Sequence, residues 1–217
     1  MKKIFLVISI AMFTFVGKAY AEMSYGISGA LTNIDASGSE TEGGERSTAD
    51  ANNTVLIPSI FAEYAFSDTI SLGLDFIPLK ADVSNKTKSR TDTETSVSGN
   101  TATTSTTRNQ SANAELKNHV TLYANYSFGG MFAKVGVAAV TLDTAESLDT
   151  GANYGNEDIY GGVIGVGMQQ DNHRFEVVYT DYEDISLTST VARTGVTNNN
   201  KIEADLDTVA FKYSYVF

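Results

Sequence analysis

Polar and apolar residues alternate with a period of two over the last nine residues of the chain. One set of alternate positions holds only apolar or aromatic residues, and the other holds a lysine and a serine. Successive side chains of a β-strand point to opposite faces, so this pattern predicts a strand with one apolar face and one polar face. The apolar set is Val209, Phe211, Tyr213, Tyr215 and Phe217; the other is Ala210, Lys212, Ser214 and Val216.

Seven further segments alternate in the same way, which gives eight predicted strands. The clearest is 114–128, where Leu116, Val120 and Leu122 share the apolar face and Glu115, Lys117 and His119 share the polar one. The predicted strands are 23–33, 54–66, 70–83, 114–128, 131–142, 159–169, 174–182 and a last one that begins near Lys201.

The connections between these segments alternate strictly between short and long. The short ones, 67–69, 129–130 and 171–172, contain the Gly, Asp and Asn residues that suit hairpin turns. The long ones are polar and lie near 35–53, 84–113, 143–158 and 183–200. Aromatic residues gather near the short turns. Membrane β-barrels combine an even strand number, short turns at one end, long loops at the other and aromatic girdles.

A soluble barrel of the lipocalin kind is the alternative, with the apolar face turned inward. Two observations disfavour it. The polar face has few of the charges that a water-exposed surface carries, and the aromatic residues cluster at one end of the strands. We therefore expect an all-β fold: an eight-stranded antiparallel up-and-down transmembrane β-barrel.

The N-terminus has the parts of a cleavable secretory signal. Lys2 and Lys3 precede an apolar stretch over 4–16, and Ala19 and Ala21 fit the small-x-small cleavage rule. An uncleaved anchor is the alternative, but the stretch is short for a span of about 20 residues. We expect a signal peptide at 1–21 and a single barrel domain at 22–217.

Composition limits the functions that this barrel can have. Without residues 1–21 the chain keeps 12 basic and 26 acidic residues, a net charge of −14, which argues against a nucleic-acid partner. No cysteine is present, so disulfides and thiolate metal sites are excluded. No cofactor is expected.

The expected mature chain resembles the small Gram-negative outer-membrane barrels of the OmpA, OmpX and opacity-protein type. The resemblance rests on the strand pattern, the signal peptide and the closing aromatic strand. It implies that Phe211, Tyr213, Tyr215 and Phe217 form the signal read by the barrel-assembly machinery. It also implies a monomer in the outer membrane, in contact with lipid and lipopolysaccharide, with both termini periplasmic. We expect no peptidoglycan-binding segment after Phe217, so wall anchoring is not carried over from the resemblance.

Eight strands enclose only enough room for side chains, so we expect the interior charges to form a salt-bridged plug. Polar filling that lets a small barrel close is the simplest role; a porin-like path is the alternative. The inward-facing charges are Glu63, Asp75, Glu115, Glu176, Lys117, Lys134, Arg174 and Lys212. His119 is expected to be a hydrogen-bonded filler, and His173 to be solvated. We find no Ser, His and acid set on a shared face, so a lipid-modifying enzyme is the third interpretation and no catalytic residue is expected.

The long connections are the expected sites of function, through a structural or adhesin-like surface role. Residues 84–113 are rich in Ser and Thr, which is typical of disorder, yet Ser98-Gly99-Asn100 is a plausible turn. We hypothesise a protruding hairpin that meets another surface by strand addition. The other loops are acidic, which predicts a solvated rim or divalent-cation bridging to lipopolysaccharide. Asp181 has the lipid-facing parity, so either the membrane band ends at Tyr179 or a bulge resets the strand.

Overall fold

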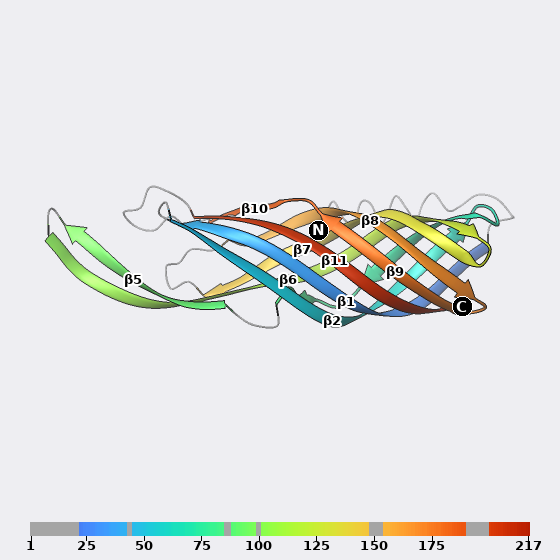
Figure 1. The fold of residues 1–217 in the computed structure, drawn as a ribbon, viewed down its shortest axis with the longest axis horizontal. Helices are drawn as coiled ribbons and strands as arrows, with labels where there is room; N and C mark the ends of the chain where they lie inside the picture. The colour runs from blue at the N-terminus through green and yellow to red at the C-terminus, as the bar shows by residue number, and fades with distance from the viewer. Residues whose placement is uncertain (1–21, 43–44, 85–87, 99–100, 148–153, 190–199) are drawn as a thin grey trace.

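The strands form a closed antiparallel ring. The computed structural model describes residues 22–42, 45–84, 88–98, 101–147, 154–189 and 200–217; the expected signal peptide lies outside these residues (Figure 1). Eight strands, β1, β2, β3, β6, β7, β8, β9 and β11, pair in this order, and β11 pairs back to β1. β4 and β5 pair with β6, and β10 pairs with β11. The strands are β1 Glu22–Glu42, β2 Glu45–Ala65, β3 Ile70–Ile77, β4 Ala81–Asp82, β5 Lys88–Ser98, β6 Thr101–Phe128, β7 Met131–Ser147, β8 Asn156–Gln170, β9 His173–Tyr182, β10 Ile185–Thr188 and β11 Lys201–Val216.

The three short connections are tight turns at one end of the ring. Gly129 and Gly130 have φ values of 60° and 84°, and Asp171 has a φ of 52°, a backbone region that suits Gly, Asp and Asn in hairpin turns. The C-terminus lies at this end as well (Figure 1). Phe217 donates its backbone N–H to the carbonyl of Tyr25 at 2.8 Å, so the last residue is held against the first strand.

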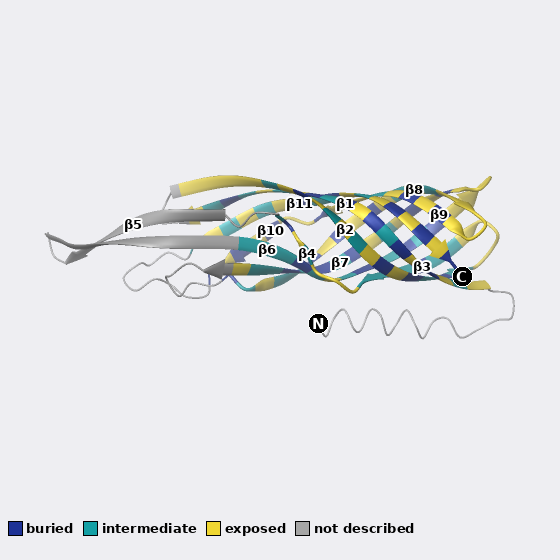
Figure 2. Cartoon of the chain, turned by 90° about the horizontal axis from the view of Figure 1, so that it is seen from below, coloured by how far each residue is buried: buried dark blue, intermediate teal, exposed yellow. Residues whose placement is uncertain are grey.

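The apolar face of the strands points out of the ring near the short turns. Along β11 the aromatic residues are exposed while Lys212, Ser214 and Val216 are buried (Figure 2). This arrangement is the reverse of a soluble barrel, whose apolar face is inside. The large exposed apolar residues include Tyr25, Ile27, Leu31, Leu56, Ile60, Val135, Val137, Ile164, Val166, Val209, Phe211, Tyr213 and Phe217.

The same alternation inverts its polarity farther along the strands, toward the long connections. In β1 the outward residue Leu31 is followed on the same face by Asn33 and Asp35, whereas the inward position becomes Ile34, which is buried. In β11 the outward Asp207 is followed by the outward Val209. A surface that changes from lipid to water along one strand would require this inversion. The apolar interior cluster contains Ile34, Val83, Leu116, Ala138, Val140, Leu142, Tyr154, Ile159, Val163, Tyr182, Ile185, Leu187 and Leu206.

Strands continue into ranges that the sequence predicted as loops. β1 and β2 pair without interruption up to Glu42 and Glu45, so much of 35–53 is paired strand. β5 and β6 pair from Lys88 and Ala112 to Ser98 and Thr101, which gives the backbone of the hypothesised hairpin in 84–113. This hairpin projects well past the ring (Figure 1). Polar strand residues carry little hydrophobic alternation, and for that reason the sequence pattern ended too early.

A β-bulge in β6 changes the predicted faces of this strand. Its register to β7 shifts between Lys117 and Val120, and Asn118 adopts a φ of 54°. One extra residue on a strand resets the alternation beyond it. Leu116, which was expected on the lipid face, is therefore buried in the apolar interior cluster.

β9 contains no such bulge. Its register to both neighbours is continuous through Asp181, whose side chain is exposed. Of the two explanations for this residue, the end of the apolar band near Tyr179 is the one that agrees with the structure. None of the described residues forms a helix long and apolar enough to cross a membrane.

Candidate functional site in the barrel interior

Arg174 and Glu63 form the centre of a charged layer that crosses the interior near the short-turn end. The two guanidinium nitrogens of Arg174, on β9, donate to the two carboxylate oxygens of Glu63, on β2, at 2.5 and 2.8 Å. Tyr123 and Asn125, on β6, donate to the same carboxylate at 2.8 and 2.9 Å. Glu63 on β2 therefore accepts hydrogen bonds from two other strands, β6 and β9, and none of the three strands is a neighbour of another. Such charge-assisted bidentate contacts are among the stronger ones in proteins.

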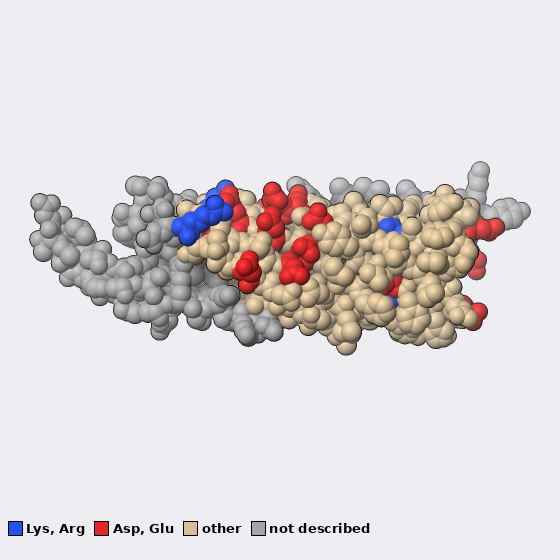
Figure 3. All heavy atoms as spheres, viewed as in Figure 1, with Lys and Arg blue, Asp and Glu red and all other residues tan. Residues whose placement is uncertain are grey.

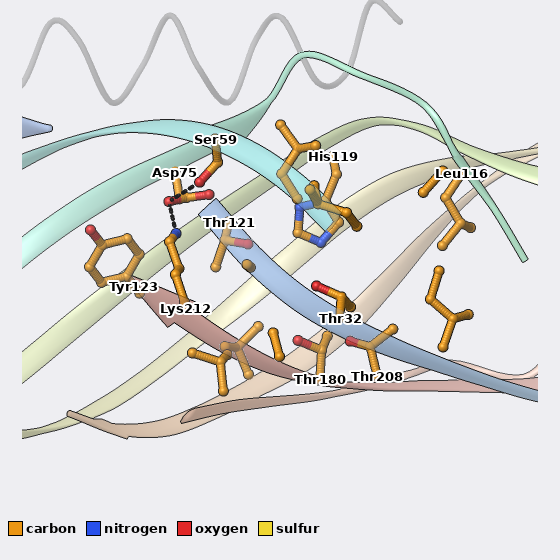
Figure 4. A pocket seen from close by; sticks show the side chains of 18 of the residues that line it. Thr32, Ser59, Asp75, Leu116, His119, Thr121, Tyr123, Thr180, Thr208 and Lys212 are labelled. Atoms are coloured by element: carbon orange, nitrogen blue, oxygen red, sulfur yellow. Dashed lines mark hydrogen bonds and ion pairs between the residues drawn. The ribbon is translucent and has the colours of Figure 1, made fainter. Parts of the chain in front are cut away.

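Two further ion pairs complete the layer. Lys134 pairs with Glu176, whose other carboxylate oxygen lies 3.9 Å from Arg174. Lys212 pairs with Asp75, which also accepts a hydrogen bond from Ser59 at 3.2 Å (Figure 4). We call these three pairs with Tyr123 and Asn125 the plug. Each charged side chain in it is at most 10% exposed, so pairing is what makes its burial tolerable.

Aromatic rings fill the space between the charges. Arg174 lies 5.1 Å from the ring centroid of Phe61 and 5.2 Å from that of Phe132. Lys134 lies 4.1 Å from the ring centroid of Tyr123. The sequence analysis did not single out Phe61 or Phe132, although their parity on β2 and β7 is the inward one. A cation near a ring face is a favourable contact, so these rings hold the cations as well as excluding water.

Glu115 and Lys117 lie outside the plug. Lys80 donates to Glu115 at 2.5 Å, and Lys117 pairs with Asp143 of the neighbouring strand. The β6 bulge turns both residues away from the interior that the simple alternation assigned to them. Lys80 is exposed, and both the hydrogen bond to Glu115 and its negative charge raise the pKa of the Lys80 amine.

The two histidines have tyrosine partners. His119 Nε2 lies 2.9 Å from the hydroxyl of Tyr182 in the interior, between the plug and the apolar cluster. His119 Nδ1 is buried and has no hydrogen-bond partner among the described residues. His173 Nδ1 lies 2.8 Å from the hydroxyl of Tyr213 on the exposed face.

The outer surface turns acidic just beyond the apolar band (Figure 3). Asp207 faces Asp35 on one side and Asp181 on the other in the strand register. Partial burial and these two negative charges raise the pKa of Asp207. Nearby, Lys201 donates to Glu203 at 2.6 Å and lowers the pKa of that carboxyl group. Among the residues that the structure describes, no set of three acids or histidines is placed to hold a metal ion.

The aromatic residues of the expected assembly signal lie on the outer face. Phe211, Tyr213, Tyr215 and Phe217 are all exposed. Phe217 stacks on Tyr25 with ring centroids 5.4 Å apart, and Tyr213 contacts Phe175 at 5.2 Å. These contacts form part of an aromatic belt around the short-turn end, which is typical of a membrane interface.

A closed ring with an apolar outer belt and a charged interior is the architecture of an outer-membrane β-barrel. The chain is similar to the outer-membrane protease OmpT from Escherichia coli, with 11% identity, a TM-score of 0.45, and coverage of 90% of this chain and 96% of that one. It is also similar to Ail, the attachment invasion locus protein of Yersinia pestis, with 7% identity, a TM-score of 0.37, and coverage of 88% and 99%.

A third similar structure is Neisserial surface protein A, with 10% identity, a TM-score of 0.36, and coverage of 89% of this chain and 99% of that one. No family model matches the chain, and no curated protein matches its sequence. The assignment of the fold therefore rests on the closed ring and on which residues face outward.

Proposed function

We propose that this protein is an integral outer-membrane barrel that does not conduct and that acts at the cell surface through its long hairpins. In this proposal the short turns and both ends of the mature chain are periplasmic, and the hairpins beyond the acidic surface are extracellular. The observation that carries it is the inversion of polarity along β1 and β11, because only a barrel that leaves lipid for water needs it. A plugged interior leaves the outer end as the place where function is exerted.

The absence of conduction follows from the plug. The three ion pairs and the rings of Phe61 and Phe132 cross the interior near the short-turn end, and each buried charge there is compensated by a partner, so none is free to draw an ion through. Single-channel recording of the full mature chain in planar bilayers tests this. We expect no steady open events. Large, lasting openings would favour the porin-like alternative and contradict a closed interior.

The surface role is supported by the unpaired edges of the projecting hairpin. β5 pairs only with β6, and β6 pairs with β7 only from Ser111 onward, so both edges of the hairpin beyond this point lack a partner strand among the described residues. Unpaired strand edges expose rows of N–H and C=O groups that a partner strand can complete. Because the adjoining surface is acidic, we propose a partner with a basic surface that adds a strand to this hairpin.

Removal of the hairpin tests the surface role. A variant would lack residues 90–110 and close the remaining Ser89–Ser111 pair with an Asn-Gly turn. A control variant would lack residues 148–153, which shortens a different outer connection. Proteoliposomes of each would be assayed against a panel of immobilised cell-surface and matrix proteins and outer-membrane vesicles. We expect binding that the hairpin deletion reduces at least tenfold and the control leaves intact. Equal binding by the two variants, or no binding by the full chain, would contradict the role.

A further inference from the structure

The pairing between β2 and β3 stops inside the apolar band. The last pair is Ile60 with Phe76, although β2 continues in register with β1 as far as Glu45. β3 then ends at Ile77, and β4 pairs only with β6. Beyond Ile60, β2 therefore has no ladder partner on this side among the described residues.

Both prolines of the chain lie where the β2–β3 ladder ends. We call this break between β2 and β3 the seam. Continuing the β2–β3 register by two positions places Pro58 opposite Pro78. Neither residue has a backbone N–H, so neither can donate a ladder hydrogen bond where the two strands would next meet. The sequence thus ends the ladder from both sides at one level.

The gap has a lower and an upper limit. The Ile60–Phe76 pair closes it below, and a hydrogen bond of 2.8 Å from the Asn53 side chain to the carbonyl of Asp82 spans it above. Seven residue steps along β2 separate these limits, which corresponds to about 23 Å of strand. The outward residues Leu56 and Ile60 on this stretch are exposed and apolar, so the gap opens toward the apolar band.

An interior cavity meets the gap from inside. Its volume is about 100 Å³, and it lies between the plug and the apolar cluster (Figure 4). Ile57 of β2 and Ile77 of β3 line it from the two sides of the seam. Leu79 also lines it and is 57% exposed, so the cavity reaches the surface between β3 and β4.

The lining of the cavity is mostly apolar, although Thr180, Thr208 and His119 add polar atoms to it. Ile34, Leu116 and Val163 line it and are buried, while the Asp75–Lys212 pair forms its polar end. An apolar cavity of ~150 Å³ binds benzene, so this one has room for the end of a hydrocarbon chain but not for a whole lipid.

We propose that the β2–β3 seam is a lateral port through which the end of one hydrocarbon chain enters the barrel from the surrounding membrane. The chain belongs either to a membrane lipid or to a free fatty acid; both present the same methylene surface. The port goes beyond a surface role, since it connects the interior with the bilayer and not with either aqueous side.

Methyl NMR of the full mature chain in nanodiscs tests the port. The chain would be deuterated except for Ile, Leu and Val methyl groups. In one arm the lipid acyl chains are protonated; in the other the lipids are deuterated and protonated palmitate is added. We expect cross-relaxation from chain methylenes to Ile34, Leu116 and Val163 in at least one arm. Val140 and Leu206, which are buried outside the cavity lining, are the controls that should show none.

Each outcome of this experiment distinguishes one source of the hydrocarbon chain or excludes the port. Contacts in the first arm identify a membrane lipid, and contacts in the second identify a free fatty acid. Contacts to exposed Leu31 but to none of the three cavity residues, in both arms, would overturn the port while leaving the membrane barrel intact.

A reversible disulfide across the seam gives a second test, in which the protein stays folded. The native chain has no cysteine, so I57C/L79C, the next facing positions in the continued register, would place one pair across the seam and leave both prolines in place. V135C/I164C is the control across the β7–β8 ladder, which is fully paired at that level. Oxidation of the first pair should abolish the cavity contacts, and reduction should restore them. Contacts that persist in the oxidised first variant, or that vanish in the control, would contradict entry at this seam.

Discussion

Arg174 of β9 holds both carboxylate oxygens of Glu63 of β2 across the width of the barrel. The two strands are not neighbours in the ring, so this contact ties opposite walls together. Arg174 also lies near a second carboxylate. Glu176 is 3.9 Å from Arg174 and pairs with Lys134, so it interacts with two cations. Two of the three pairs in the plug are therefore linked through Glu176, and the Lys212–Asp75 pair adjoins them through the ring of Phe61, which lies near both Arg174 and Lys212.

Removal of one partner of this contact should be costly. Glu63→Gln leaves the Arg174 cation buried without its counter-charge, and breaking such a pair typically costs about 3 kcal/mol or more. Urea unfolding in lipid micelles, followed by gel mobility, measures the loss. Glu203→Gln breaks an ion pair whose side chains are both about half exposed and is the matched control, with less than about 1 kcal/mol expected.

A double variant that lacks both charges should recover part of the lost stability. Glu63→Gln with Arg174→Met removes both charges, so it should unfold at a higher urea concentration than Glu63→Gln alone. A double variant as unstable as the single one would show that the uncompensated charge is not the cause.

Gly73 leaves room for a plug residue. A Cβ at this position of β3 would lie 2.2 Å from the ring of Tyr123, which donates to Glu63 and lies against Lys134. Gly73→Ala should therefore displace the ring and destabilise the barrel by about 1–3 kcal/mol. Gly162→Ala, where no atom lies within 4 Å of the added carbon, should have little effect in the same unfolding assay. Equal losses in the two variants would contradict a steric cause.

Asp207 should make stability depend on pH at the outer surface. Its pKa is raised in the folded state, so the folded protein binds the proton more readily than the unfolded chain does. The penalty is then present above the folded pKa and disappears as pH falls below the ordinary pKa of an Asp carboxyl group. Asp207→Asn should stabilise the barrel at neutral pH, by less than about 1 kcal/mol, and leave it unchanged in acid.

The control for this prediction is Asp205→Asn. Asp205 lies on the same strand and face, but Ser37 and not an acid is its partner in the β1 register. A stabilising effect that is equal in the two variants, or that is independent of pH, would exclude repulsion from Asp35 and Asp181 as the cause.

Alternation alone is sufficient to assign the faces of most strands, because a residue of β11 such as Phe211 or Lys212 has only two directions to point. It fails where a β-bulge adds one residue to a strand. The bulge at Asn118 has no hydrophobic signal of its own, and it moves Leu116 inward and Glu115 and Lys117 outward.

The extent of the strands was also underestimated, for a related reason. Beyond the apolar band the outward residues are polar, so segments such as 35–42 look like loops unless the inverted pattern is sought. Ile34 and Asp35 already show this inversion in the sequence. The seam at Pro58 and Pro78 could be suspected from the prolines, but their facing positions depend on a strand register that only the structure gives.

The most direct test of the account is which residues touch lipid. The chain contains no tryptophan, so single substitutions serve as probes of position. Phe211→Trp lies on the exposed face of β11, and Phe132→Trp lies in the buried interior of β7. In bilayers of brominated lipid, the account predicts strong quenching of fluorescence in Phe211→Trp and little quenching in Phe132→Trp. Equal quenching, or the reverse order, would contradict a barrel whose apolar belt faces the membrane.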